Sequence, residues 1–350
     1  MFMKYIKLCT QFIILYGFCS TTVFADKTDI VVLINGNAVT GEIKSLDFGV
    51  LRYSTDSMGT VNIDWEDIVN VTTQQNLQIE VTDGQRYYGH LTAPEERHTI
   101  RLKTLSAVYD FQMAEVVRIT PIETDDSFWQ RLDGSFSFGL QTTKSTEITT
   151  SSVSGDVSYR AREYLLGLRL TSNITDQPSD GDPGSGTSAR QTLQFNYQRF
   201  KKNRWFTDWF TSWEKNDELG IESRLSIGGA LGRYLVQTNK NQFSLTLGVQ
   251  AAREKFVGDD EETTTPEGRL EIRYLRRKLI PETSITFTSK VYPSLKDLSS
   301  YRAEVDLSLR REFFEDLFFD LTVGYSYLSE PPTDAASADY VVTTSLGYSF

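Results

Sequence analysis

Residue types that usually carry chemistry are scarce in this chain. Its only histidines are His90 and His98, and its only cysteines are Cys9 and Cys19. Both histidines fall in or beside a turn, where an isolated histidine is more often inert than a metal ligand. Both cysteines lie in a segment that we expect to be removed, so disulfides and thiol chemistry are not expected in the mature chain. We predict no metal site and no cofactor.

Closely spaced carboxylates are the remaining source of acid–base chemistry. Glu304 and Asp306 lie two positions apart, and such a pair could act as a general acid and base. Hydrolases with a serine nucleophile need a histidine base, and residues 132–350 contain no histidine. Ion pairing is the simpler explanation of these charges, so we predict that the chain is not an enzyme. A barrel hydrolase remains a less favoured alternative.

The overall composition excludes several classes of protein. The 350 residues carry a formal charge of −11, and the pI is about 4.9, which argues against nucleic acid as a partner. Hydrophobic residues make up 39%, so global disorder is not expected. After the N-terminus there is no apolar run of about 18 residues, which excludes a helical membrane protein.

Residues 1–25 have the pattern of a secretory signal peptide. Lys4 and Lys7 precede a short apolar stretch, and Val23-Phe24-Ala25 places small side chains at the first and third positions before a cleavage point. A membrane-anchoring helix would need a longer apolar run. A lipoprotein modified at Cys19 is disfavoured because Phe18 is bulky where a small residue is expected.

The next region contains an internal repeat at an offset of 48 residues. Asn35-Gly36 in the first unit, residues 26–74, corresponds to Asp83-Gly84 in the second unit, residues 75–120. These dipeptides supply the positive φ angles of tight hairpins, and alternating apolar residues flank them. We expect two small five-stranded barrels of the SH3 or Sm type. The aligned glycines Gly41 and Gly89 are interpreted as turn residues.

A polar linker over residues 121–131 separates this repeat from a region with a different pattern. Residues 132–350 contain long alternating segments with short turns and no helical period between them. The segment 204–214 is ambiguous, because tryptophans and phenylalanines occupy opposite faces. We expect about 12 strands, near 132–143, 148–160, 163–175, 188–200, 204–214, 220–236, 241–255, 266–276, 282–292, 298–311, 316–328 and 338–350.

Strand length and loop asymmetry favour a transmembrane β-barrel over a soluble sandwich. Most segments reach the roughly nine to eleven residues of a tilted membrane strand, whereas soluble strands average about five or six. If the first strand leaves the periplasm, the longer polar loops 176–187, 256–265 and 329–337 all face outward, which is the usual arrangement. The acidic run Asp259 to Glu262 could attract divalent cations, although a solvated loop is the favoured interpretation.

Electrostatics decides which face of each strand meets lipid. A charge at the bilayer midplane costs about 2–4 kcal/mol on a lipid-facing barrel position, so the charged face must line the lumen. Its mixed signs suggest an ion-paired interior that holds the barrel in register rather than a strongly selective pore. The predicted lumen residues are Arg169, Arg224, Glu271, Arg273, Arg302, Glu304, Asp306, Arg310 and Asp320.

The C-terminal strand alternates to the last residue and ends in phenylalanine. This pattern is similar to the signal read by the outer-membrane assembly machinery. Its residues include Tyr340, Leu346, Tyr348 and Phe350.

The two-part layout resembles the salt-induced outer-membrane protein family, also called the domain-of-unknown-function 481 family. The resemblance rests on Asn35-Gly36, Val39-Thr40-Gly41, Leu51, Val61-Asn62-Ile63-Asp64-Trp65 and Ile68, followed by a barrel that ends in Tyr348-Ser349-Phe350. The family implies an outer-membrane barrel with no defined activity. In the second repeat, Gln112-Met113 replaces Asp64-Trp65, so a shared role of that tryptophan is not expected.

These observations predict an all-β outer-membrane protein, structural or weakly permeable, with its N-terminal repeats in the periplasm. The expected partners are outer-membrane lipid and lipopolysaccharide, the assembly machinery, and an envelope component that contacts residues 26–120. The alternative is a soluble periplasmic binding module, which keeps the signal peptide and the repeats but does not explain the long strands.

Overall fold

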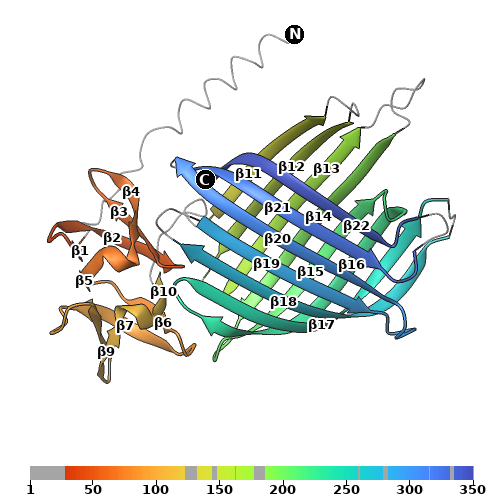
Figure 1. Ribbon diagram of the computed structural model, residues 1–350. Coiled ribbons are helices and arrows are strands. Elements are labelled where there is room, and N and C mark those ends of the chain that lie inside the picture. The colour runs from red at the N-terminus through yellow and green to blue at the C-terminus, as the bar shows by residue number, and fades with distance from the viewer. Residues whose placement is uncertain are drawn as a thin grey trace, which may run out of the picture.

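The computed structural model describes residues 28–122, 132–143, 148–161, 163–176, 186–258, 261–278, 283–314, 316–331 and 335–349. The predicted signal peptide, residues 123–131 of the predicted linker, the pair Asp259-Asp260 and the C-terminal Phe350 lie outside these residues. The chain folds into an N-terminal sheet domain and a barrel (Figure 1). Among the described residues, no helix is long and apolar enough to cross a membrane.

The N-terminal domain, here called the module, consists of two units with the same order of elements. Each unit has five strands, with a short 3-10 turn between the fourth and the fifth. The first unit contains β1 (Asp29–Leu33), β2 (Ala38–Asp47), β3 (Val50–Thr55), β4 (Gly59–Asp64), η1 (Trp65–Asp67) and β5 (Ile68–Thr72). The second contains β6 (Leu77–Val81), β7 (Arg86–Thr92), β8 (Thr99–Lys103), β9 (Val108–Gln112), η2 (Met113–Glu115) and β10 (Val116–Pro121).

The repeated hairpins have the same local chemistry. Gly36 and Gly84 adopt φ angles of +85° and +81°, which glycine tolerates without strain. The side chain before each glycine accepts a hydrogen bond from the backbone two residues on: Asn37 N donates to Asn35 Oδ1 at 2.9 Å, and Gln85 N donates to Asp83 Oδ1 at 2.8 Å. The two units, which are offset by 48 residues, therefore share the geometry of this turn as well as its sequence.

The two units merge into one ten-stranded sheet. Strand β10 pairs with β6 of its own unit and with β2 of the other, so the central strands run in the order β2-β10-β6. One continuous hydrophobic core extends through both units, and Ile43, Tyr53, Ile79 and Ile119 in it are fully buried. The sequence predicted two units, and their fusion follows from the β2–β10 pairing.

Trp65 ties the two units together. Its indole is 2% exposed, and its Nε1 donates a hydrogen bond to the Met113 carbonyl oxygen at 2.7 Å. Met113 is the repeat equivalent of Trp65, so the two positions contact each other instead of repeating one role. This explains structurally why the second unit has no tryptophan there.

Gly41 and Gly89 are strand residues, and their interpretation as turn residues was wrong. They lie inside β2 and β7, where a Cβ atom would come within 2.5 Å of the Ser54 carbonyl oxygen and 2.2 Å of the Lys103 carbonyl oxygen. Glycine is needed at both positions because another backbone approaches closely.

The C-terminal region forms a closed antiparallel barrel of twelve strands, which confirms the predicted fold class. The first and last strands pair, with Phe136 opposite Tyr348. Observed strand ends differ from the predicted ones by a few residues. The strands are β11 (Leu132–Thr143), β12 (Ile148–Arg160), β13 (Tyr164–Asp176), β14 (Thr187–Phe200), β15 (Trp205–Asn216), β16 (Ile221–Gln237), β17 (Asn241–Phe256), β18 (Thr263–Lys278), β19 (Thr283–Pro293), β20 (Tyr301–Phe314), β21 (Leu317–Leu328) and β22 (Ala338–Ser349).

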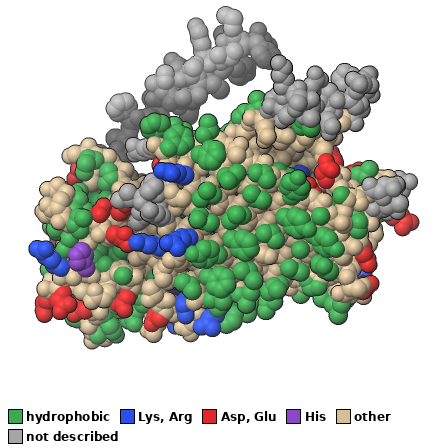
Figure 2. All heavy atoms as spheres, in the orientation of Figure 1, with side chains coloured by type: hydrophobic (Ala, Val, Ile, Leu, Met, Phe, Trp, Pro, Cys, Tyr) green, Lys and Arg blue, Asp and Glu red, His purple; other side chains and the backbone are tan. Residues whose placement is uncertain are grey.

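The outward face of the barrel is a broad apolar surface (Figure 2). The ambiguous segment resolves within β15: Trp209 is 61% exposed on the outward face, whereas Phe206 and Phe210 are buried on the inward face. In β22, Tyr340, Leu346 and Tyr348 point outward and are exposed. The pattern of period two along each strand therefore separates an apolar outside from a polar inside.

Candidate functional site

All nine residues predicted to line the lumen lie on the inward side of their strands. Arg224, Arg302 and Asp320 are buried, whereas Arg169 and Arg273 have exposed side chains. Inward orientation also follows from contacts between strands that are not neighbours. Arg310 of β20 donates to Ser135 Oγ of β11 at 3.3 Å, and such a contact can only cross the lumen.

The densest ion-pair network in the lumen surrounds Arg302. Its guanidinium donates to both carboxylate oxygens of Glu267, with Nη2 and Nε each at 3.0 Å, and Nη1 donates to Glu304 at 2.6 Å. The guanidinium also lies 3.5 Å from the centroid of the Tyr292 ring. Gln250 donates to Glu267 at 2.7 Å, which leaves that buried carboxylate fully engaged. These bonds link β17, β18, β19 and β20 on the inside of the barrel.

A second network is centred on Arg224 of β16. Its Nη1 donates to Glu214 of β15 at 3.1 Å, and its Nε is bonded to Glu254 of β17. The arginine is 3% exposed, so its charge needs both carboxylates. On β18, Arg269 pairs with Glu271 and lies 3.8 Å from the centroid of the Phe210 ring.

Two further arginines connect strands on either side of the seam where β11 pairs with β22 to close the barrel. Arg310 does so through its bond to Ser135 of β11. Arg190 of β14 donates to Ser326 Oγ of β21 at 2.8 Å and pairs with Asp339 of β22 at 3.3 Å. Arg310 pairs with Asp320 at 3.2 Å and lies 3.8 Å from the centroid of the Phe318 ring. The lumen is therefore crossed at more than one level by charge-assisted hydrogen bonds.

Arg169, Arg273 and Asp306 differ from the other predicted lumen residues. Within the part of the chain that the structure describes, they form no ion pair within 4 Å. Arg169 interacts electrostatically at longer range with Arg273, Asp156, Asp306 and Arg310. The side chains of Arg169 and Arg273 are exposed within the lumen, so water that enters it can solvate their charges.

Sequence reasoning missed several residues of these networks. They occupy the same inward register as the predicted ones, so the alternation within each strand could have revealed them. The missed residues are Asp156, Arg190, Glu214, Glu254, Glu267, Arg269, Lys290 and Asp339.

The module lies against one end of the barrel through the centre of its sheet (Figure 1). Arg118 of β10 is 8% exposed and pairs with Asp47 of β2 at 2.9 Å and Glu80 of β6 at 3.4 Å. Glu80 in turn accepts a hydrogen bond from Gln237 of β16 at 3.2 Å. Burial raises the pKa of Asp47, but the charges of Arg118, Arg160 and Arg277 and the hydrogen bond from Arg118 together outweigh burial and hold this pKa below its usual value.

Phe200, the last residue of β14, is held between charged groups of the module and the barrel. The Arg160 guanidinium of β12 lies 3.9 Å from the centroid of the ring, and the Arg118 guanidinium of the module lies 5.8 Å from it. Around this centre, Arg52 pairs with Asp133 at 3.0 Å, and Glu66 pairs with Lys240. The contacts extend from β11 to the turn after β16, so the module lies over this part of the mouth of the barrel.

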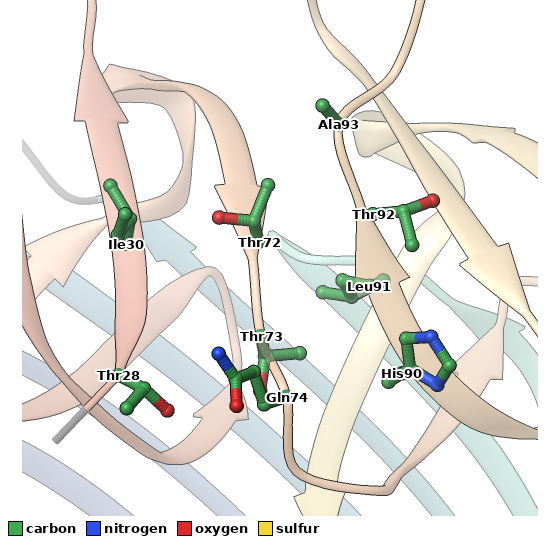
Figure 3. Close-up of a pocket in the computed structure, with 9 residues that line it drawn as sticks. All are labelled: Thr28, Ile30, Thr72, Thr73, Gln74, His90, Leu91, Thr92 and Ala93. Carbon is green, nitrogen blue, oxygen red and sulfur yellow. The ribbon is translucent and has the colours of Figure 1, made fainter. Parts of the chain in front are cut away.

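The histidines lie in the module, away from the lumen. His90 of β7 lines a shallow recess of about 500 Å³ between β1, β5 and β7, together with Ile30, Thr72 and Leu91 (Figure 3). His98 adopts a φ of 60°, and its backbone N–H donates to the Val69 carbonyl oxygen at 3.3 Å. Among the described residues, no group of three or more histidine, cysteine or acidic side chains could hold a metal ion.

Residues 135–350 match the family described as a protein of unknown function, DUF481. The chain belongs to this family, in agreement with the resemblance found in the sequence. The curated proteins contain no match to the chain.

Several solved structures are similar at low identity. The β domain of the Bordetella autotransporter BrkA is 13% identical, with 63% of this chain and 97% of that chain covered and a TM-score of 0.33. An outer-membrane channel from Pseudomonas putida F1 is 11% identical, with 63% and 95% covered and a TM-score of 0.37. A porin structure is 8% identical, with 63% and 99% covered and a TM-score of 0.28.

Proposed function

We propose that the chain is an outer-membrane β-barrel whose module lies in the periplasm, with a structural or weakly permeable role and no catalytic activity. The closed barrel with an apolar outside and an ion-paired inside carries this proposal. Ile227, Leu247 and Val342 are 66%, 60% and 52% exposed on the outward face. A soluble monomer rarely leaves a contiguous apolar patch larger than a few hundred Å², whereas lipid requires such a band.

The connections between strands support the periplasmic orientation of the module. At the module's end of the barrel the strands join through residues 161–163, 201–204 and 238–240. At the opposite end, the connections at 177–186 and 329–337 are longer. Outer-membrane barrels have short periplasmic turns and longer external loops, so the module belongs on the periplasmic side.

The lumen chemistry supports a passive role. A catalytic carboxylate has to be able to change its protonation state, but Glu267 and Glu304 are both engaged by Arg302. The barrel sequence also contains no histidine that could act as a base. We therefore propose that the lumen charges stabilise the barrel, and that the module limits passage through the mouth it covers.

The proposed partners follow from the surfaces of the molecule. Outer-membrane lipid and lipopolysaccharide would surround the apolar band, and the assembly machinery would recognise the C-terminal strand. An envelope partner would contact the module, whose outer edge strand β9 pairs only with β8 among the described residues. Tyr87, Tyr109 and Phe111 form an aromatic cluster next to that edge, with centroid distances of 4.9 to 6.1 Å.

Cell fractionation tests the location against the alternative of a soluble periplasmic module. We expect the expressed chain in the outer-membrane fraction, with a gel band that shifts when the sample is boiled because the closed barrel resists detergent until heated. Recovery in the soluble periplasm without a heat-shifted band would reject the proposal.

Cysteine labelling tests the orientation. Ser299→Cys lies in the exposed connection between β19 and β20, and Ser106→Cys lies in an exposed turn of the module. We expect a membrane-impermeant maleimide to label Ser299→Cys in intact cells and to label Ser106→Cys only after lysis. The reverse result would place the module outside the cell.

A further inference from the structure

Four arginines occupy equivalent positions at the module's end of the barrel. They are Arg199 of β14, Arg233 of β16, Arg276 of β18 and Arg311 of β20, here called the rim arginines. All four are exposed and lie in the outward register, since their strand partners include the outward residues Trp205, Ile285 and Phe319. Each belongs to a strand that runs toward the module, and each lies near the end of that strand.

Each rim arginine has an outward aromatic residue beside it. Arg233 lies 5.5 Å from the centroid of the Trp205 ring, and Arg199 is the register partner of Tyr164. Tyr274 precedes Arg276 by two positions on the same face, and Phe319 is the register partner of Arg311. Aromatic rings mark the boundary between hydrocarbon and headgroups in membrane barrels. The guanidinium groups therefore lie at the level of the lipid phosphates.

The charge distribution of the whole barrel agrees with this placement. On the face that Figure 2 shows, Lys and Arg side chains gather where the barrel meets the module, with some acidic side chains beside them, and further acidic side chains lie at the opposite end. At the opposite end, outward cations are neutralised by carboxylates: Arg253 pairs with Glu262, and Lys255 pairs with Glu222 at 2.8 Å. On the module's side, Arg199 pairs with Glu163 at 3.9 Å, whereas the other three rim arginines form no ion pair within 4 Å with the described residues. Uncompensated outward positive charge is therefore greater on the module's side.

We propose that the rim arginines bind anionic phospholipid headgroups in the leaflet on the module's side. Arginine matches a phosphate with two parallel donors, and basic side chains near an anionic surface add attraction that salt weakens. Bound lipid would fix the depth of the barrel in the membrane and the distance of the module from its surface. This inference rests on the proposed insertion of the barrel into a membrane, but it does not depend on conduction.

Spin-labelled lipids provide the test. The full chain is reconstituted in phosphatidylcholine bilayers, and the fraction of motionally restricted label is compared for phosphatidylglycerol and phosphatidylcholine probes. We expect the wild-type chain to prefer phosphatidylglycerol severalfold at low salt, and we expect 1 M NaCl to reduce the preference. The quadruple variant Arg199→Gln, Arg233→Gln, Arg276→Gln, Arg311→Gln should bring the ratio close to one.

Two controls identify the source of the preference. Arg253→Gln removes an outward arginine from the other end and should leave the ratio unchanged. The quadruple Arg→Lys variant keeps the charge and should retain most of the preference, which separates lipid binding from a folding defect. Restricted lipid without any preference would overturn the lipid-binding proposal alone. Absence of restricted lipid would overturn membrane insertion and this proposal together.

Discussion

At the scale of single residues, two buried arginines of the lumen, Arg224 and Arg302, each bind two carboxylates. Arg302 is 6% exposed and pairs with both Glu267 and Glu304, whereas Arg169 is exposed and forms no ion pair within 4 Å with the described residues. Removing Arg302 would leave Glu267 buried without a cation, whereas Glu304 would keep Lys290 at 3.5 Å. Arg302 and Arg169 are therefore expected to contribute very differently to the stability of the barrel, although both are arginines.

Arg302→Ala should destabilise the barrel strongly. Removing one partner of a buried ion pair costs about 3–5 kcal/mol, because the remaining buried carboxylate, here Glu267, loses its compensation. The free energy of unfolding in detergent micelles, measured by urea titration, checks this. Arg169→Ala is the matched control and should change the same quantity by only about 0.5 kcal/mol. Equal effects of the two variants would contradict the assigned network.

Asp47 should make the module sensitive to acid. Burial is outweighed by Arg118 together with Arg160 and Arg277, which hold the pKa of Asp47 below its unfolded value of about 3.9. The stabilisation is therefore present above that pH and is lost as the pH falls through the lower folded value. Asp47 is half-buried, so we expect less than about 1 kcal/mol. Asp47→Asn should be less stable than the wild-type chain at pH 7 and equally stable near pH 2. A constant difference across this range would disprove the pairing.

At the scale of elements, the sequence predicts the strands from their local pattern but does not predict which distant strands pair. The alternation in 301–310 or 317–327 is a property of neighbouring residues, so the barrel strands could be predicted closely. The β2–β10 pairing joins Asp47 to Arg118, which are 71 residues apart, and no local pattern indicates it. Missed lumen residues such as Glu267 lie inside the predicted strands, here 266–276, and share the inward register of the predicted Glu271 and Arg273, so the alternation alone could have identified them.

Gly89→Ala should disrupt the second unit of the module. The added Cβ would lie 2.2 Å from the Lys103 carbonyl oxygen, so β7 and its partner would have to separate. Overpacking of this kind typically costs about 1–3 kcal/mol. Hydrogen exchange of β7 and β8 amides should become faster. Gly155→Ala on β12 is the control, since its Cβ would meet atoms no closer than 3.8 Å. Unchanged protection of β7 in Gly89→Ala would contradict this packing.

At the scale of the whole molecule, the barrel and module act as one closed unit. The charged set of Asp47, Glu80 and Arg118 faces Phe200 and Gln237 at the mouth of the barrel. These residues come from five strands in both domains, so they are assembled only when the module is docked. Permeability is therefore expected to depend on docking as well as on the width of the lumen.

Reversing the charge of Arg118 should open the mouth of the barrel. Arg118→Glu places a third carboxylate beside Asp47 and Glu80, and like charges buried together repel, so the module should leave the barrel. In planar bilayers we expect the wild-type full-length chain to conduct little and Arg118→Glu to conduct severalfold more. Arg97→Glu makes the same change of charge on an exposed module loop and should behave like the wild-type chain. A heat-shifted gel band in all three would show that each barrel is folded. Equal conductance of Arg118→Glu and the wild-type chain would then mean that the covered mouth does not limit passage, and the ion pairs that cross the lumen would be left as the barrier.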